Sequence, residues 1–237
     1  MGKSYFQFKR FTVHQERCAM KVGTDGVLLG SWADISEAER ILDIGTGTGL
    51  IALMCSQRNP GAEVWAIDID KASAEQAKEN VQNSEFRDSI QVLNRSLQEF
   101  TSEKLFDSII CNPPFFSSGT PSPIYERYLA RQSESLPLGI LIENSMRLMS
   151  DSGKIHLIIP LNRESELKAL CQEFGLHPIR KCVVFPSRTL EAKRLLIECS
   201  MVYQEIVEEV LIIEKEERFD YTDEFIELTR EFYPKMT

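Results

Sequence analysis

The sequence has few of the residues that build metal sites. Only three histidines occur in 237 residues, they lie far apart, and none stands at ligand spacing from a cysteine. The six cysteines include no pair separated by two residues, the spacing that zinc sites commonly use. We therefore expect no metal, and cysteines that stay reduced in the protein core.

Long apolar runs are also missing. No segment approaches the roughly 18 apolar residues of a membrane span, and MGKSYFQFKRF at the start has too few apolar residues for a signal peptide. We expect a soluble, cytoplasmic monomer without membrane contacts. The length and the 43% hydrophobic content favour one domain over residues 1–237. Within it we distinguish an N-terminal extension with the first helix (1–33), a core (38–200) and a C-terminal segment (201–237).

The net charge of −9 argues against indiscriminate binding to nucleic acid, but the charges are unevenly distributed. Residues 1–21 and 178–194 each hold five basic residues and one acidic residue, whereas 204–237 hold eleven acidic and four basic residues. The two basic segments could contact a polyanion, although scattered surface charge explains either one alone equally well. The candidate RNA contacts are Lys9, Arg10, Arg188, Lys193 and Arg194.

Strand and helix patterns alternate along the chain. Short apolar runs that end in turns predict buried parallel strands at ERILDIG, AEVWAID, SIQVLN, LFDSIIC and GKIHLIIP. Helical patterns separate them, and IRKCVVF and KRLLIECS flank a turn as in a hairpin. These patterns predict an α/β fold with a doubly wound, mostly parallel, seven-stranded sheet covered on both faces. Residues 5–20 predict a small hairpin before the first helix.

A glycine-rich turn, LDIGTGTGL, follows the first of these strands. Such turns let backbone amides approach an anionic or electron-rich ligand at a helix N-terminus. Gly47, Gly49 and Ala52 also satisfy the G-x-G-x-x-A pattern of a dinucleotide fold, and Asp68 ends the second strand, where a carboxylate suits an adenosine ribose. The pattern indicates an adenosine cofactor. NAD remains possible, as does a plain turn beside a surface aspartate.

Asp43 precedes these glycines and extends the pattern to D-x-G-x-G-x-G over residues 43–49. This run resembles the first motif of the class I S-adenosylmethionine-dependent methyltransferases. The resemblance implies that the acid and the glycine loop hold the amino-acid part of S-adenosyl-L-methionine, whose ammonium group a dinucleotide lacks. It implies cofactor contacts at Asp43, Gly45, Thr46, Gly47, Gly49, Asp68, Ile69, Ser96, Leu97 and Asn112. At Ser96 and Leu97 the chain lacks the acid with which many class I enzymes contact the adenine amine. We expect a backbone group near Leu97 to make this contact instead.

The stretch NPPFF follows the fourth strand. Its first four residues, Asn112, Pro113, Pro114 and Phe115, are the candidate catalytic residues. An exocyclic amino group of a base is a poor nucleophile, because its lone pair is delocalised into the ring. An amide oxygen and a proline carbonyl that accept its two N–H hydrogens would favour the transition state, and the phenyl ring would hold a flipped base. The simplest alternative is a proline turn with aromatic residues packed in the core.

This stretch resembles the (N/D)PP(Y/F) motif of amino-methyltransferases, which act on adenine N6, guanine N2 or protein glutamine. KVGTDGVLLG, together with EAKRLLIECS and YTDEFIELTREFY, is similar to the bacterial tRNA(Val) adenine-N6 methyltransferases, which modify the adenosine immediately 3′ of the anticodon. That resemblance spans nearly the whole chain. It places Lys21, Gly23, Thr24 and Asp25 at the border of the cofactor or target pocket. Without it, GTDGVLLG would be interpreted as a capped amphipathic helix.

The resemblance implies S-adenosylmethionine-dependent methylation of adenosine N6 in tRNA. Guanine-N2 methylation of ribosomal RNA is an alternative, but such enzymes often carry a duplicated domain that this length excludes. Glutamine-N5 methylation of a translation factor fits less well, because tyrosine usually ends that family's motif. An NAD oxidoreductase would leave NPPFF without a role, and a nucleotide-binding module without catalysis would tolerate the loss of Asn112.

Overall fold

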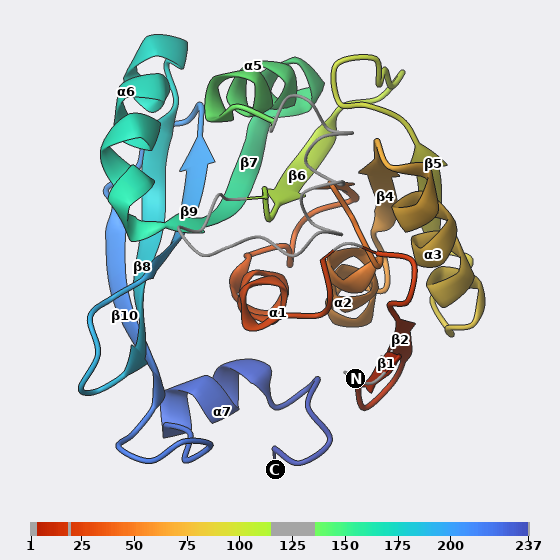
Figure 1. The fold of residues 1–237 in the computed structure, drawn as a ribbon. Helices are drawn as coiled ribbons and strands as arrows, with labels where there is room; N and C mark the ends of the chain where they lie inside the picture. Colours follow the sequence, from red (N-terminus) through yellow and green to blue (C-terminus); the bar gives the residue numbers. More distant parts are fainter. Residues whose placement is uncertain (1–3, 19, 115–135, 237) are drawn as a thin grey trace.

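The computed structural model describes residues 4–18, 20–114 and 136–236. A large twisted sheet runs through the centre, with helices on both of its faces (Figure 1). Its strands are β3 (Arg40–Ile44), β4 (Glu63–Asp68), β5 (Ile90–Asn94), β6 (Phe106–Cys111), β7 (Met149–Pro160), β8 (His177–Ser187), β9 (Arg194–Ser200) and β10 (Val207–Glu214). The helices are α1 (Thr24–Trp32), α2 (Leu50–Arg58), α3 (Lys71–Gln82), α5 (Leu138–Leu148), α6 (Glu164–Phe174) and α7 (Asp223–Thr229), with a 3-10 turn, η1 (Leu161–Arg163).

The strand order confirms the doubly wound fold and corrects the strand count. The order is β10-β8-β9-β7-β6-β3-β4-β5, and of these described strands only β9 runs antiparallel to its neighbours. Within the described residues the sheet therefore has eight strands, whereas the sequence predicts seven. The additional strand, β10, comes from the acidic C-terminal segment and pairs in parallel with β8 at the edge of the sheet. The alternation of buried and exposed residues along β10 is weak. Of its apolar residues only Leu211 is buried, while Val207 and Val210 are exposed.

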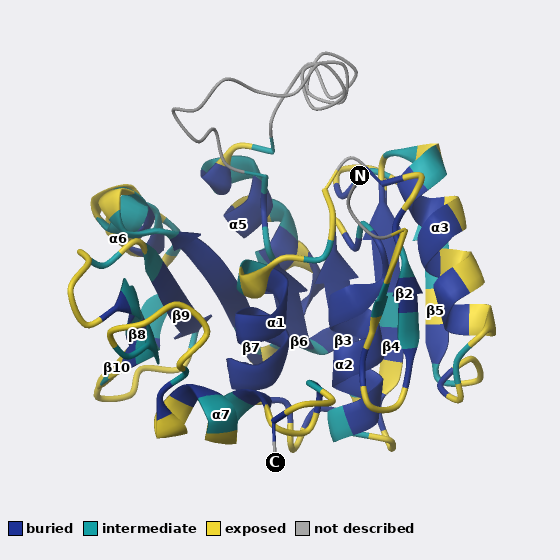
Figure 2. Ribbon diagram, turned by 60° about the horizontal axis from the view of Figure 1, so that its bottom comes forward, coloured by how far each residue is buried: buried dark blue, intermediate teal, exposed yellow. Residues whose placement is uncertain are grey.

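The core consists of two apolar clusters, one on each face of the sheet. Successive residues of a strand point to opposite faces, so Ile41 joins the cluster under α1, α2 and α7, and Leu42 joins the cluster under α5. The central strands are buried along most of their length (Figure 2). This packing holds the carboxyl ends of β3, β4 and β6 in fixed positions.

The N-terminal hairpin of β1 (Tyr5–Gln7) and β2 (Thr12–His14) is fastened to the body of the molecule. The amide of Asn80 on α3 accepts from the backbone N–H of His14 at 2.9 Å and donates to the carbonyls of His14 and Thr48 at 2.8 Å each. One side chain thus joins the hairpin, α3 and the glycine loop. The hairpin therefore helps to place Cys18 and Met20 beside the glycine loop.

The two ends of the described chain also lie side by side (Figure 1). The backbone N–H of Lys9 donates to the carbonyl of Phe232 at 2.8 Å, and its ammonium group donates to the carbonyl of Met236 at 2.8 Å. The rings of Phe6 and Phe8 pack against Tyr233. The N-terminal hairpin and the last residues of the C-terminal segment therefore pack against each other.

Candidate functional site

The candidate site lies where the order of the strands reverses. β3 pairs with β4 on one side and with β6 on the other, and Ile44 stands opposite Cys111. The residues that follow these two, Gly45 and Asn112, therefore leave the sheet next to each other. In doubly wound sheets ligands bind at this point, beyond the carboxyl ends of the strands.

The glycine loop requires glycine for its shape. Gly45, Gly47 and Gly49 have positive φ angles of 69°, 56° and 81°, a region that side chains with a Cβ atom rarely occupy. A Cβ atom at Gly49 would also lie 3.3 Å from the Cβ of Ala77 on α3. A Cβ atom at Gly45 would meet no atom within 4 Å, so this part of the loop faces open space. The loop therefore leaves a cradle for a ligand.

Asp43 lies buried beneath the glycine loop. Its carboxylate Oδ2 accepts from the hydroxyl of Thr46 at 2.6 Å and from the backbone N–H of Ala52 at 3.2 Å, while Oδ1 is buried without a partner among the described residues. Burial raises the pKa of Asp43 to about 7. Asp43 lines neither of the hollows described below. Its visible contribution is to hold the loop against the start of α2.

Asp68 stands at the end of β4 and points into the site. One carboxylate oxygen accepts from the backbone N–H of Gly47 and the other from that of Asp70, both at 2.8 Å. Burial raises the pKa of Asp68 to about 6. An ionised carboxylate offers about four acceptor positions. Each oxygen of Asp68 therefore keeps one position for a ligand hydroxyl.

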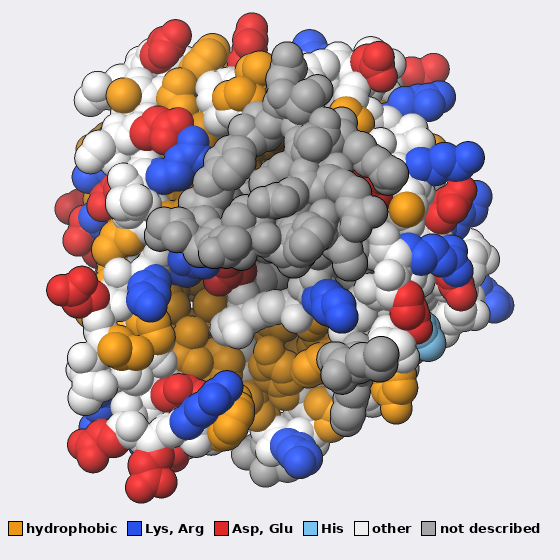
Figure 3. All heavy atoms as spheres, in the orientation of Figure 1, with side chains coloured by type: hydrophobic (Ala, Val, Ile, Leu, Met, Phe, Trp, Pro, Cys, Tyr) orange, Lys and Arg blue, Asp and Glu red, His pale blue; other side chains and the backbone are white. Residues whose placement is uncertain are grey.

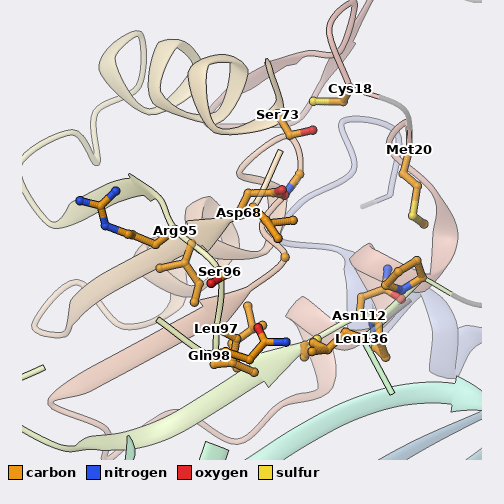
Figure 4. A pocket seen from close by; sticks show the side chains of 18 residues that line it. Cys18, Met20, Asp68, Ser73, Arg95, Ser96, Leu97, Gln98, Asn112 and Leu136 are labelled. Atoms are coloured by element: carbon orange, nitrogen blue, oxygen red, sulfur yellow. The ribbon is translucent and has the colours of Figure 1, made fainter. Parts of the chain in front are cut away.

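A hollow opens in front of Asp68, and side chains from distant segments converge on it (Figure 4). The predicted residues that line it are Gly45, Gly47, Asp68, Ile69, Ser96, Leu97, Asn112, Pro113 and Pro114. Sequence reasoning missed Cys18, Met20, Ser73, Arg95, Gln98 and Leu136. Arg95 and Gln98 flank two predicted positions, whereas Cys18 and Met20 reach the site only because the hairpin is fastened to α3. The walls of this first hollow combine apolar side chains with the buried carboxylate of Asp68.

A second hollow adjoins the first on the side of α1. It is lined by five more predicted contacts, Lys21, Gly23, Thr24, Asp25 and Thr46, whereas Gly49, like Asp43, lines neither hollow. Both hollows share Met20, Gly45, Gly47 and Asn112. An added Cβ atom at Gly26 would lie 4.0 Å from the amide nitrogen of Asn112. Asn112 therefore stands between the glycine loop and the first turn of α1, at the junction of the two hollows.

The proline pair fixes the backbone after Asn112. Pro113 is buried and Pro114 is half-buried, and both line the first hollow. Proline restricts φ and has no N–H to donate, so the turn is stiff. Phe115, the proposed platform for the base, lies outside the described residues. The structure thus brings three of the four candidate catalytic residues to the site.

Two of the candidate RNA contacts lie near the chain termini. Lys9 is exposed, and its ammonium group binds the carbonyl of Met236. Arg10 forms a two-bond ion pair with the carboxylate of Glu85, with both distances 2.9 Å. Both cations remain at the surface.

The other three candidates lie at the turn between β8 and β9. Arg194 forms an ion pair with Asp25 at 2.8 Å, which links β9 to the start of α1 beside the second hollow. Lys193 and Arg188 are exposed, and neither side chain has a hydrogen bond or ion pair within the described part of the chain. Among these three candidates, Lys193 and Arg188 therefore keep their charges unpaired within the described residues.

The described residues include no group of three or more His, Cys, Asp or Glu side chains that could hold a metal ion. Among the same residues, no helix is long and apolar enough to cross a membrane.

Taken together, this sheet, glycine loop and carboxylate define a class I methyltransferase fold, and solved structures share it. A predicted O-methyltransferase from Agrobacterium tumefaciens superposes with a TM-score of 0.69 at 21% identity, over 88% of this chain and 96% of that one. TYW2 of P. horikoshii, solved in complex with MeSAdo, gives a TM-score of 0.60 at 13% identity, over 85% of this chain and 74% of that one. Residues 23–175 match the Methyltransferase small domain family.

Relatives of similar sequence narrow the assignment from a fold class to one family. The chain is 42% identical to the tRNA1(Val) (adenine(37)-N6)-methyltransferase of Trichodesmium erythraeum, over 99% of this chain and 100% of the relative. It is 43% identical to the protein of the same name from Flavobacterium psychrophilum, over 98% and 100%. The chain belongs to the tRNA1(Val) (adenine(37)-N6)-methyltransferase family.

Proposed function

We propose that this protein methylates N6 of adenosine 37 in tRNA1(Val), with S-adenosyl-L-methionine as the methyl donor. The observation that carries the proposal is the position of Asn112, at the junction of the hollow that contains Asp68 and the hollow beside α1. Family membership over the full chain supports the substrate. We further propose that the enzyme acts as a cytoplasmic, single-domain monomer.

The first hollow suits the donor. S-adenosyl-L-methionine would supply a methyl group on a positively charged sulfur. Asp68 would accept hydrogen bonds from the two ribose hydroxyls, since both of its oxygens keep a free acceptor position. Ile69 and Leu97 would enclose the adenine ring between apolar side chains, and the open face of Gly45 would leave room for the amino-acid part.

We assign Asp43 to positioning rather than to direct contact with the donor. Its carboxylate binds Thr46 and Ala52 from below the loop and is fully buried. The unpartnered Oδ1 leaves one acceptor for a water or for a ligand group that reaches under the loop. Asp43 thus stays part of the proposed donor site, but it supports the glycine loop and does not contact the donor directly.

Asn112 and the following proline act on the target base. The amide oxygen of Asn112 and the carbonyl of Pro113 would accept the two N6 hydrogens and draw the nitrogen lone pair out of the ring. These fixed acceptors favour the transition state, in which positive charge develops on N6. No general base is required beforehand, because the nitrogen becomes strongly acidic once methylated and releases its proton to water.

The experiment that tests the function is a product analysis. Purified protein is incubated with labelled S-adenosyl-L-methionine and RNA from cells that lack its gene, and the RNA is then digested to nucleosides. We expect label in N6-methyladenosine. Label in N2-methylguanosine would favour the ribosomal RNA alternative, and label in protein would favour glutamine methylation.

We predict that donor-site affinity falls below about pH 6. The pKa of Asp68 is raised to about 6, so this carboxyl becomes protonated in the free protein as the pH drops through that value. A protonated carboxyl loses acceptor capacity for the ribose hydroxyls, so S-adenosylhomocysteine should bind progressively more weakly from pH 7 to pH 5 and evenly above pH 7. Calorimetric titration over this range measures the effect.

The matched control for this titration is Asp68→Asn, which keeps the shape of the side chain and removes its ionisation. Asp43 still titrates in that variant, because burial is the main cause that raises its pKa and the charge of Asp68 is a smaller one. A steeper fall below pH 6 in the wild type than in Asp68→Asn assigns the effect to Asp68. Identical curves would show that Asp68 does not bind the donor.

We predict that Lys193 contacts an RNA phosphate. Each phosphate contact contributes roughly 0.7 to 0.9 to the slope of log affinity against log salt, so Lys193→Ala should lower the slope for tRNA by about that amount. Lys104→Ala is the matched control. Lys104 is exposed just before β6, at the amino ends of the parallel strands and so away from the site. A slope that is unchanged in Lys193→Ala, or lowered equally in both variants, contradicts the contact.

A further inference from the structure

A further hollow of about 400 Å³ lies between the ends of β8 and β10, the first turn of α1, and α7. Its lining includes the aromatic rings of Phe219, Tyr221 and Tyr233. Figure 3 shows apolar side chains gathered in a depression below the grey atoms, with basic side chains around it. None of the groups proposed above for methyl transfer explains why this surface is aromatic.

Phe219 is held in an exposed position. Its side chain is 66% exposed, and its φ angle of 70° is the only positive value of a non-glycine residue in the described chain. The backbone N–H of Phe219 donates to the carboxylate of Glu214 at 2.9 Å, and that of Lys215 donates to the carbonyl of Asp220 at 2.7 Å. These bonds close the turn and direct the ring outward. Packing within the chain therefore does not account for the ring.

Two cations that form no ion pair among the described residues line this hollow together with the ring. The guanidinium of Arg218 lies 4.9 Å from the centre of the Phe219 ring, and the unpaired Lys193 also lines the hollow, as does the carboxylate of Glu214. Arg194 also lines it, but its charge is matched by Asp25. An exposed aromatic face between cations is the combination that binds single-stranded nucleic acid, by base stacking and phosphate contact together. An apolar peptide would use the rings but not the cations.

The hollow adjoins the proposed target site. Thr24 and Asp25 line both this hollow and the one that holds Asn112. An RNA strand whose target base reaches Asn112 would therefore pass the first turn of α1, and the neighbouring part of the strand would lie over the aromatic surface.

We propose that this hollow binds an unpaired nucleotide of the RNA substrate near the target adenosine. Its base stacks on Phe219, and its phosphate lies between Lys193 and Arg218. The inference rests on the proposed function, since it takes tRNA as the substrate, and it adds a second base-binding site outside the pocket for methyl transfer.

The test compares Phe219→Leu and Phe219→Trp, both of which keep a large apolar side chain at the same backbone position. The control is Tyr203→Leu, because Tyr203 is a 74% exposed aromatic residue against His177, at the opposite end of β8. The affinity of each variant for a fluorescein-labelled tRNA1(Val) transcript is measured by anisotropy over a range of salt. S-adenosylhomocysteine binding checks that each variant is folded.

Base stacking contributes enough that Phe219→Leu should weaken tRNA binding on the order of tenfold. The salt slope should stay unchanged, since no charge is lost. Phe219→Trp and Tyr203→Leu should bind as the wild type does. Wild-type affinity in Phe219→Leu, as expected if the hollow takes an apolar peptide instead, overturns the proposal, and so does equal weakening in the leucine and tryptophan variants. Failure of the wild type to methylate the transcript would instead refute the proposed function. Methylation is measured separately from the binding affinities, so the two failures can be distinguished.

Discussion

Alanine in place of Asn112 is expected to slow methyl transfer on the order of 10²- to 10³-fold, the usual cost of losing one preorganised polar contact to a transition state. The effect should fall on the chemical step, because charge develops on N6 only as the new bond forms. Affinities for tRNA and for S-adenosylhomocysteine should change little. Single-turnover rates with both substrates saturating separate the rate from binding.

Asn112→Asp is the matched control, because aspartate keeps an acceptor oxygen of similar size at the same position. It should retain far more activity than the alanine variant. If Asn112→Ala, folded and saturated with both substrates, reacts at nearly the wild-type rate, the proline turn is only structural and the proposed role of Asn112 is wrong.

Asp68→Ala should weaken binding of S-adenosylhomocysteine on the order of 100-fold, since hydrogen bonds to a charged group contribute about 1.5 to 3 kcal/mol each. The substitution removes the two acceptor positions that face the hollow. It also leaves the backbone N–H groups of Gly47 and Asp70 without their present partner. Isothermal titration at pH 8, where Asp68 is ionised in the wild type, measures the loss.

Asp70→Ala distinguishes a lost ligand contact from a disturbed loop. The Asp70 carboxylate accepts from the backbone N–H of Ser73 at 2.9 Å and caps α3, but it does not line the hollow. Its loss should cost about 1 kcal/mol of stability and leave the affinity near the wild-type value. Equal losses of affinity in the two variants would show that Asp68 acts only by shaping the backbone.

The strands that carry the site could be predicted from local pattern alone. β3, β4 and β6 are short apolar runs: Gly45 follows β3, Asp68 ends β4 and Asn112 follows β6. The cap that Asp70 forms on α3 is likewise a local feature, because a capping side chain lies within three residues of its partner. β10 could not be predicted from local pattern. An edge strand buries one face only in part, and the glutamates of β10 resemble those of a solvated tail.

Other parts of the site depend on contacts between distant segments, which no local pattern reveals. Arg194 and Asp25 are 169 residues apart in sequence, yet their ion pair joins β9 to α1. Arg194 was therefore predicted as an RNA contact, although its charge is already matched. Met20 reaches the hollow only through the packing of the hairpin on α3. The burial of Asp43 likewise follows from the way α2 covers the end of β3.

The most direct test of the function is the position of the methyl group. Two transcripts of tRNA1(Val), one unaltered and one with guanosine in place of adenosine 37, are incubated with the protein and labelled S-adenosyl-L-methionine. We expect N6-methyladenosine in the first transcript and no incorporation in the second. Equal labelling of the two transcripts, or no labelling of the first by folded protein that binds it, would contradict the proposed function.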